Sequence, residues 1–94
     1  MSNEVQTVSG EATICNRYGL HARPAALIVK TARRYLSEIT LEDDFGSFNA
    51  KEIMAVLTGE FCHGKKIRIV AAGLDAQAAV TALTDVLSNI PIEA

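Results

Sequence analysis

The sequence has few of the features that set unusual proteins apart from small globular domains. It contains no Trp, only two Cys and only 5% aromatic residues among its 94 residues. Two cysteines form at most one bridge, which excludes a disulfide scaffold, and so few aromatic rings offer little surface for stacking bases. Because 9 basic and 11 acidic residues give a net charge of −2, general nucleic-acid binding is not expected either.

The sequence also lacks an apolar run long enough to cross a membrane. Its first residues, MSNEVQTVSGE, are polar and acidic, whereas a secretory signal starts with basic residues and continues with an apolar stretch. We therefore expect a cytoplasmic protein without membrane insertion. A chain of this length is expected to form one domain over 1–94, with little room for a deep substrate cleft.

Two hydrophobic periods alternate along the chain. Apolar residues at every second position predict strands over 8–14, 39–41, 47–50 and 67–71. Helical periodicity predicts helices from 22 to about 35, over 53–58, and from Asp75 to a point before Pro91. The order β-α-β-β-α-β-α, with one apolar face per element, predicts an α+β fold in which three helices cover one face of a four-stranded antiparallel sheet.

The ends of the helices carry further signals. Leu36 is expected to continue the apolar stripe of the first helix, and Arg33 and Arg34 to occupy its last turn, where cations are favourable. Asn49 and the carboxylate three residues later form a variant of the capping box for the second helix. Asp75 is expected to cap the third helix.

The most informative segment is GLHARPA, residues 19–25, at the start of the first helix. The first N–H groups of a helix have no acceptor within the helix, and with the helix dipole they form a site for anions. A phosphoryl group on the ring of His21 would lie within reach of these N–H groups and of Arg23, whose guanidinium can bond two oxygens. An isolated His before a helix is more often an ordinary cap or surface residue. Gly19, Arg23 and Pro24 beside it favour the interpretation that His21 carries a phosphoryl group.

This segment, together with the chain length and the order of the elements, resembles HPr, the histidine-containing phosphocarrier of the sugar phosphotransferase system. The resemblance implies an open-faced two-layer β-sandwich and a monomer that needs no cofactor. It implies that Nδ1 of His21 accepts a phosphoryl group from phosphorylated enzyme I and passes it to a histidine of an EIIA-type domain. Ala22 and Arg23 would bind the phosphate. Such a protein is a phosphoryl carrier rather than an enzyme with a small-molecule substrate of its own.

The resemblance also implies a docking surface beside His21. Arg23, Leu27, Lys30 and Arg34 recur on one stripe of the first helix, and their interpretation as a basic docking face competes with that of an ordinary solvated face. A short second helix cannot bury all of its apolar side chains, so an apolar patch is expected there, with Met54 and Leu57 preferred. The docking residues so assigned are Arg17, Leu20, Leu27, Lys30, Ile53, Met54 and Leu57.

Glu52 departs from the resemblance. Gram-positive HPr proteins carry a serine at this position, which a dedicated kinase phosphorylates, whereas a carboxylate has no hydroxyl to modify. We therefore do not expect kinase control through this residue. A second departure is Gly59-Glu60, where many relatives have Leu-Gly.

Other candidate residues have ordinary interpretations. Cys15, Cys62 and His63 lack the spacing of metal ligands, and the carboxylates of 42–44 are interpreted as a solvated turn. Three alternatives to the sugar carrier stay open. They are a carrier of the nitrogen-related phosphotransferase branch, a non-catalytic regulatory module that binds partners through Met54 and Leu57, and, last, a small metal-binding protein.

Overall fold

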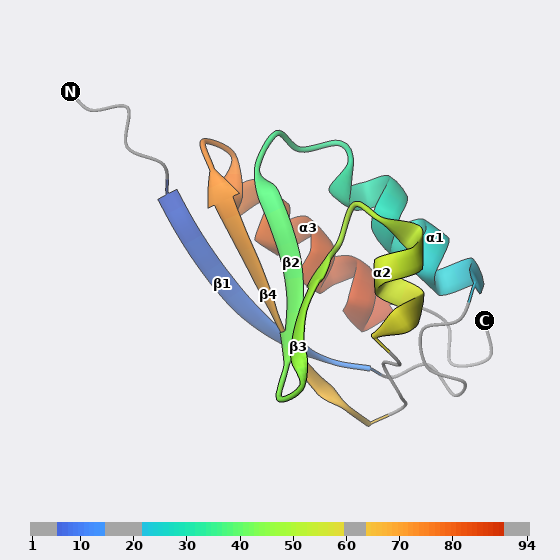
Figure 1. Cartoon of the computed structure of the whole chain (residues 1–94). Helices are drawn as coiled ribbons and strands as arrows, with labels where there is room; N and C mark the ends of the chain where they lie inside the picture. The colour runs from blue at the N-terminus through green and yellow to red at the C-terminus, as the bar shows by residue number, and fades with distance from the viewer. Residues whose placement is uncertain (1–5, 15–21, 60–63, 90–94) are drawn as a thin grey trace.

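The computed structural model describes residues 6–14, 22–59 and 64–89, and its elements follow one another in the predicted order. The strands are β1 (Gln6–Thr13), β2 (Glu38–Asp43), β3 (Gly46–Asn49) and β4 (Lys66–Gly73). The helices are α1 (Ala22–Ala32), α2 (Ile53–Thr58) and α3 (Ala76–Asn89). The helices all lie on one side of the sheet, which confirms the two-layer α+β architecture (Figure 1).

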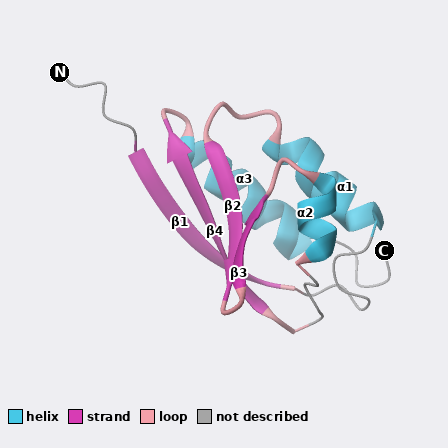
Figure 2. Ribbon diagram, in the orientation of Figure 1, coloured by secondary structure: helices cyan, strands magenta, loops and turns pink. Residues whose placement is uncertain are grey.

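The four strands are antiparallel and run in the order β1-β4-β2-β3. β2 and β3 form a hairpin, while β1 and β3 are the two edges of the sheet (Figure 2). α3 packs on β1 and β4, whereas α2 packs against α1 and contacts β3. The pair α1 and α2 therefore lies towards one edge of the sheet, and α3 towards the other.

Alternate side chains of each strand face the helices and form the core. Ile39 and Leu41 of β2 and Ile67 and Ile69 of β4 are at most 1% exposed. Leu83 of α3 fills the space above them and is fully buried. The other strand face carries polar residues that are exposed or half-buried, as the sequence predicts: Ser9, Glu11, Thr13, Thr40, Glu42 and Arg68.

The first helix ends earlier than predicted. α1 stops at Ala32, and the amides of Arg34 and Tyr35 donate to the carbonyls only three residues back, which tightens the chain into a turn. Arg33 and Arg34 thus lie beyond the helix, and Leu36 is 87% exposed instead of belonging to the core stripe. No helix in the described ranges is both long and apolar enough to cross a membrane.

The predicted side-chain caps of the other two helices do not form, although Asp75 directly precedes α3 and its carbonyl accepts the amide of Ala79 at 2.9 Å. The side chain of Asn49 accepts a hydrogen bond from the amide of Lys51, at 2.9 Å, in a turn that precedes α2. Glu52 occupies the N-cap position and makes no side-chain capping bond. The carboxylate of Asp75 turns away from α3 and accepts bonds from the amide of Leu36 at 2.8 Å and from the amide of Ser37 at 2.9 Å. It also accepts the hydroxyl of Ser37, so it joins two loops.

Candidate functional site

The first turn of α1 presents the described part of the predicted site. Ala22 begins the helix and is exposed, as is Arg23, while the ring of Pro24 is buried at a position where its missing N–H costs no hydrogen bond. The first turn carries no acidic residue that would compete for an anion. His21, Arg17 and Leu20 lie outside the described residues. The described turn thus presents helix N–H groups that have no acceptor within the helix, beside the exposed Arg23.

The predicted docking stripe of α1 is exposed along its length. Arg23 and Lys30 are exposed, and so is Leu27, with 44% of its surface accessible between them. Arg34 follows just beyond the end of the helix and is also exposed. Because the opposite side of α1 is buried, at Ile28 and elsewhere, this stripe faces away from the core.

α2 adds apolar surface beside this stripe. Met54 is 68% exposed, whereas Ile53 and Leu57 are half-buried and pack against the core. The structure thus brings Met54 to the surface as expected. Leu57 contributes less exposed area than the sequence suggested, because a helix resting on both α1 and β3 turns part of this side chain inward.

Two basic residues that the sequence analysis did not place in the site join α1 to α2. The guanidinium Nε of Arg33 donates to the carbonyl of Lys51 at 2.9 Å, and the ammonium of Lys51 donates to the carbonyl of Tyr35 at 2.6 Å. These crossed bonds hold the turn before α2 against the end of α1. A shallow groove between the helices is lined by Ala26, Val29, Lys30, Arg33 and Ile53. We call these two bonds of Arg33 and Lys51 the buttress; in the sequence only the charge of the two residues pointed to it.

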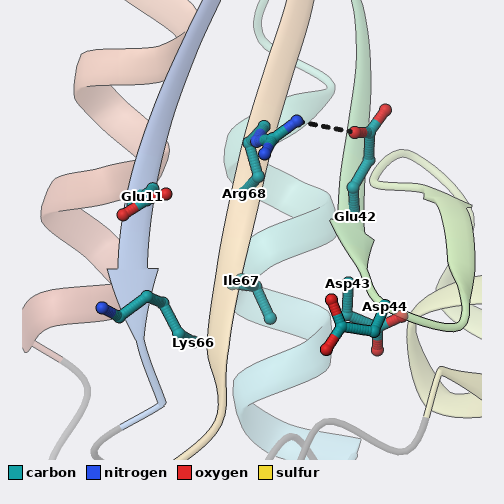
Figure 3. A pocket seen from close by; sticks show the side chains of 7 residues that line it. All are labelled: Glu11, Glu42, Asp43, Asp44, Lys66, Ile67 and Arg68. Atoms are coloured by element: carbon teal, nitrogen blue, oxygen red, sulfur yellow. Dashed lines mark ion pairs between the residues drawn. The ribbon is translucent and has the colours of Figure 1, made fainter.

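On the opposite side of the sheet, a charged hollow lies on the open face (Figure 3). Arg68 stands between two carboxylates in the register of the sheet, opposite Glu11 of β1 and Glu42 of β2. Its guanidinium lies 3.8 Å from the carboxylate of Glu42. Four carboxylates and two cations line the hollow, so both signs of charge meet here with an excess of negative charge. None of the predicted site residues lines it.

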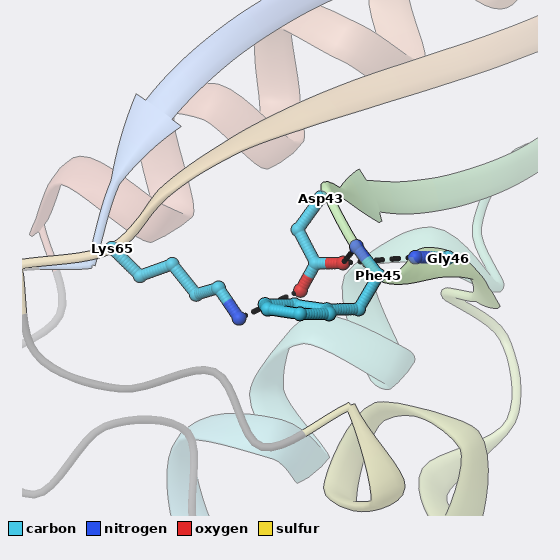
Figure 4. Close-up of polar contacts among 4 residues, drawn as sticks. All are labelled: Asp43, Phe45, Gly46 and Lys65. Carbon is cyan, nitrogen blue, oxygen red and sulfur yellow. Dashed lines mark hydrogen bonds and ion pairs between the residues drawn. The ribbon is translucent and has the colours of Figure 1, made fainter.

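The turn between β2 and β3 is less solvated than predicted. Only 2% of the side chain of Asp43 is exposed, and its carboxylate pairs with the ammonium of Lys65 at 2.8 Å (Figure 4). It also accepts the amides of Phe45 at 2.7 Å and Gly46 at 3.1 Å. The bond from Lys65 is the main cause that lowers the pKa of Asp43, followed by the amide of Phe45. The sequence did not indicate that Asp43 is buried, because Lys65 is distant from it in the sequence but adjacent in the fold.

The ion pair of Asp43 and Lys65 also helps to hold the end of β1, which precedes the candidate site in the sequence. The carbonyl of Lys65 accepts the amide of Ile14 at 2.8 Å, and the amide of Gly64 donates to the carbonyl of Ile14 at 2.7 Å. Asp43 thereby holds the segment that pairs with the end of the first strand. Within the ranges that the structure describes, no three His, Cys, Asp or Glu side chains converge to form a metal site. Cys15, Cys62 and His63 lie outside these ranges.

Comparison with known proteins identifies the family. A family model described as the PTS HPr component phosphorylation site matches residues 8–89. The chain belongs to the HPr family. The phosphocarrier protein HPr of Borreliella burgdorferi is 40% identical over 82 residues, which are 87% of this chain and 95% of that protein. The phosphocarrier protein HPr of Treponema pallidum is 42% identical over 76 residues, 81% of this chain and 86% of that protein.

Solved HPr structures share the fold. The crystal structure of HPr from Thermoanaerobacter tengcongensis superimposes with a TM-score of 0.81 at 39% identity, covering 85% of this chain and 90% of that chain. Its similarity confirms the expected open-faced HPr architecture. The family match also spans α1 and α2, where the predicted HPr site and docking surface lie. The roles of the individual residues stay predictions.

Proposed function

We propose that this HPr-family protein is a cytoplasmic carrier that accepts a phosphoryl group on His21 from phosphorylated enzyme I and passes it to EIIA-type domains. The observation that carries the proposal is the family match over 8–89, in which a helix begins at Ala22, directly after this histidine. The exposed first turn of that helix supports it, because a phosphoryl group there would lie near Arg23 and near N–H groups that have no acceptor within the helix.

The proposed transfer needs only one nucleophile in this chain. The lone pair of Nδ1 of His21 forms a bond to phosphorus while the bond from phosphorus to the donor group of enzyme I breaks, and its electron pair stays with the donor. The imidazole must be neutral and carry its proton on Nε2, because the attacking nitrogen needs a free lone pair. The second transfer reverses these roles towards the acceptor histidine of the EIIA domain.

Arg23 and the N–H group of Ala22 are proposed to hold the phosphoryl oxygens. Charge spreads over these oxygens as the phosphoryl group moves between donor and acceptor, so fixed donors act mainly in the transition state. An exposed helix end suits a group that must be received and released in turn. A buried cage would hold the group too firmly for onward transfer.

The basic stripe and the apolar surface of α2 are proposed to dock both partners. Leu27 and Met54 supply exposed apolar area, and Lys30 and Arg23 flank it with positive charge. Interfaces of this kind combine an apolar centre with charges that speed the encounter. The buttress of Arg33 and Lys51 fixes α2 beside α1, so that the two parts of the surface keep one geometry.

The decisive experiment incubates the protein with phosphoenolpyruvate and enzyme I and follows a phosphoryl group that is lost in acid and kept in base. His21→Ala should abolish incorporation, and His63→Ala, which changes the only other histidine, should not. Incorporation that survives His21→Ala, or none in the unaltered protein, would contradict the proposal. Enzyme I of the sugar branch and of the nitrogen-related branch, tested side by side, distinguishes the two circuits.

A second measurement tests Arg23. Arg23→Ala should slow transfer by about 10²–10³-fold, the usual effect of removing one fixed donor to a developing charge. Lys66→Ala, which removes a positive charge from the exposed face of the sheet, is the matched control and should leave the rate unchanged. Equal rates for the two variants would remove Arg23 from the mechanism.

A further inference from the structure

The open face of the sheet, which no described helix covers, is apolar at one end (Figure 2). In β4, Val70 and Ala72 alternate with the core residues Ile69 and Ala71, so their side chains belong to the open face. Both are half-buried. The residues beside them in β1 and β2 are three small polar residues and one carboxylate: Thr7, Ser9, Thr40 and Glu38.

Two exposed leucines extend this apolar end. Leu36 precedes β2 and is 87% exposed, and Leu74 follows β4 and is 77% exposed. Continued for two residues beyond Glu38↔Ala72, the antiparallel register of β2 and β4 sets the two leucines opposite each other. They share the parity of Ala72, so they continue the open face. Large apolar side chains that are exposed next to one another indicate an interaction surface.

The backbone that carries these leucines is held firmly. The amides of Leu36 and Ser37 donate to the carboxylate of Asp75 at 2.8 Å and 2.9 Å, and the hydroxyl of Ser37 donates to it as well. A Cβ added at Gly73 would lie 2.7 Å from the Cα of Ser37, so the two loops touch. Because the backbone is fixed before a partner arrives, less ordering is needed when the leucines are covered.

The other end of the open face is the charged hollow, whose side chains rise from β1, β2 and β4 on the side away from the helices (Figure 3). Lys65 pairs with one of its carboxylates, that of Asp43. Apart from that pair, the described residues of the open face carry four carboxylates and two cations. They are Glu11, Glu38, Glu42, Asp44, Lys66 and Arg68. The open face therefore combines an apolar end with an excess of negative charge.

We propose that the open face docks a segment of a partner protein in which apolar side chains are followed by basic ones. The leucines, Val70 and Ala72 contact the apolar part, and the hollow attracts the basic part, because complementary charges steer and orient association. An excess of carboxylates repels an anionic lipid surface and nucleic acid, so a basic protein segment is the occupant that fits. The proposal does not depend on phosphoryl transfer.

The open face and the α1–α2 surface suit different partners. Arg23, Lys30 and Arg34 make the α1–α2 surface basic, whereas the open face is acidic. The two surfaces lie on opposite sides of the sheet, so both can be occupied at once (Figure 1).

A designed peptide tests the proposed chemistry. Leucine alternates with serine in its first half and lysine with serine in its second, and it is titrated into ¹⁵N-labelled protein while the amide NMR shifts are followed. We expect shifts at Thr7, Ser9, Val70 and Ala72, and none in α1 or α2. The control peptide has glutamate in place of each lysine and should bind at least about tenfold more weakly.

Variants of the protein test the apolar end. Leu36→Ser with Leu74→Ser should weaken binding of the lysine peptide about tenfold, because the peptide then covers less apolar surface. Both side chains are exposed, so the fold should persist, which circular dichroism checks. Leu27→Ser removes an exposed leucine from α1 instead, and should leave peptide binding unchanged.

Several outcomes would overturn the proposal. They are no shifts with the lysine peptide, shifts that map to α1 and α2, and equal binding of the glutamate peptide. Unchanged binding by the double leucine variant would also overturn it. So would open-face shifts that follow protein concentration without any peptide, because a second copy would then cover the face.

Discussion

Gly73, at the end of β4, tests how tightly the two loops at that end of the sheet are joined. A Cβ added at this position would lie 2.7 Å from the Cα of Ser37 and 2.9 Å from its Cβ. Ser37 is 1% exposed and cannot move aside freely, because its amide and hydroxyl both donate to Asp75. Gly73→Ala must therefore displace backbone and disturb this network.

The expected loss follows from the overlap. Forcing an extra methyl group into a packed site costs about 1–3 kcal/mol of unfolding free energy. Because the added Cβ would meet the backbone of Ser37 and not a flexible side chain, we expect about 2–3 kcal/mol. For a domain of this size each kcal/mol lowers the melting temperature by about 4–8 °C, so a fall of roughly 8–24 °C is expected. Thermal unfolding followed by circular dichroism measures it.

Gly46 provides a matched control for the backbone. Its φ of +159° is nearly that of Gly73, +156°, so alanine meets the same intrinsic backbone preference at both positions. At Gly46 the added Cβ would lie 3.6 Å from the ring of Phe48, an ordinary contact. Gly46→Ala should lower the melting temperature far less than Gly73→Ala. Equal losses would refute the reasoning, because they would assign the whole effect to φ and none to Ser37.

Three further results are expected. The hydroxyl of Ser37, followed by the amide of Leu36, lowers the pKa of Asp75 below its ordinary 3.8. The carboxylate therefore contributes stability above pH 3.8, and this contribution is lost as the pH falls through the lower pKa of the folded state. The urea midpoint should drop in this acid range, and a similar drop in Asp75→Asn would contradict the assignment. Lys65→Met should raise the pKa of Asp43 towards its ordinary value, and a carboxyl NMR titration that finds no change would show that the amide donors suffice. Leu83→Ala, at a fully buried position, should cost about 2–5 kcal/mol of unfolding free energy in urea titrations, and a loss below this range would mean that the core refills the cavity.

The sequence allowed the elements to be predicted because each one has a single buried face. The alternation in β4 and the helical spacing of α3 report that face directly, and both elements lie where expected. The candidate phosphate site could also be predicted, because the histidine, the arginine and the start of the helix are contiguous in residues 19–25.

Most of these errors have one cause: contacts with residues distant in the sequence decide which local interaction a side chain makes. Asp75 has the right chemistry for a cap, but a serine 38 residues away takes its carboxylate. Asp43 looks solvated until Lys65, 22 positions later, is placed against it. Leu36 continues the apolar period, yet periodicity does not report where the backbone hydrogen bonds of a helix stop.

Net charge hides how unevenly the charged side chains of this chain are distributed. An overall charge of −2 gives no hint that Arg23, Lys30 and Arg34 gather on one exposed surface, while Glu11 is the single charged residue of β1. A carrier that must meet a donor and then an acceptor at the same α1–α2 surface cannot also use that surface for lasting association.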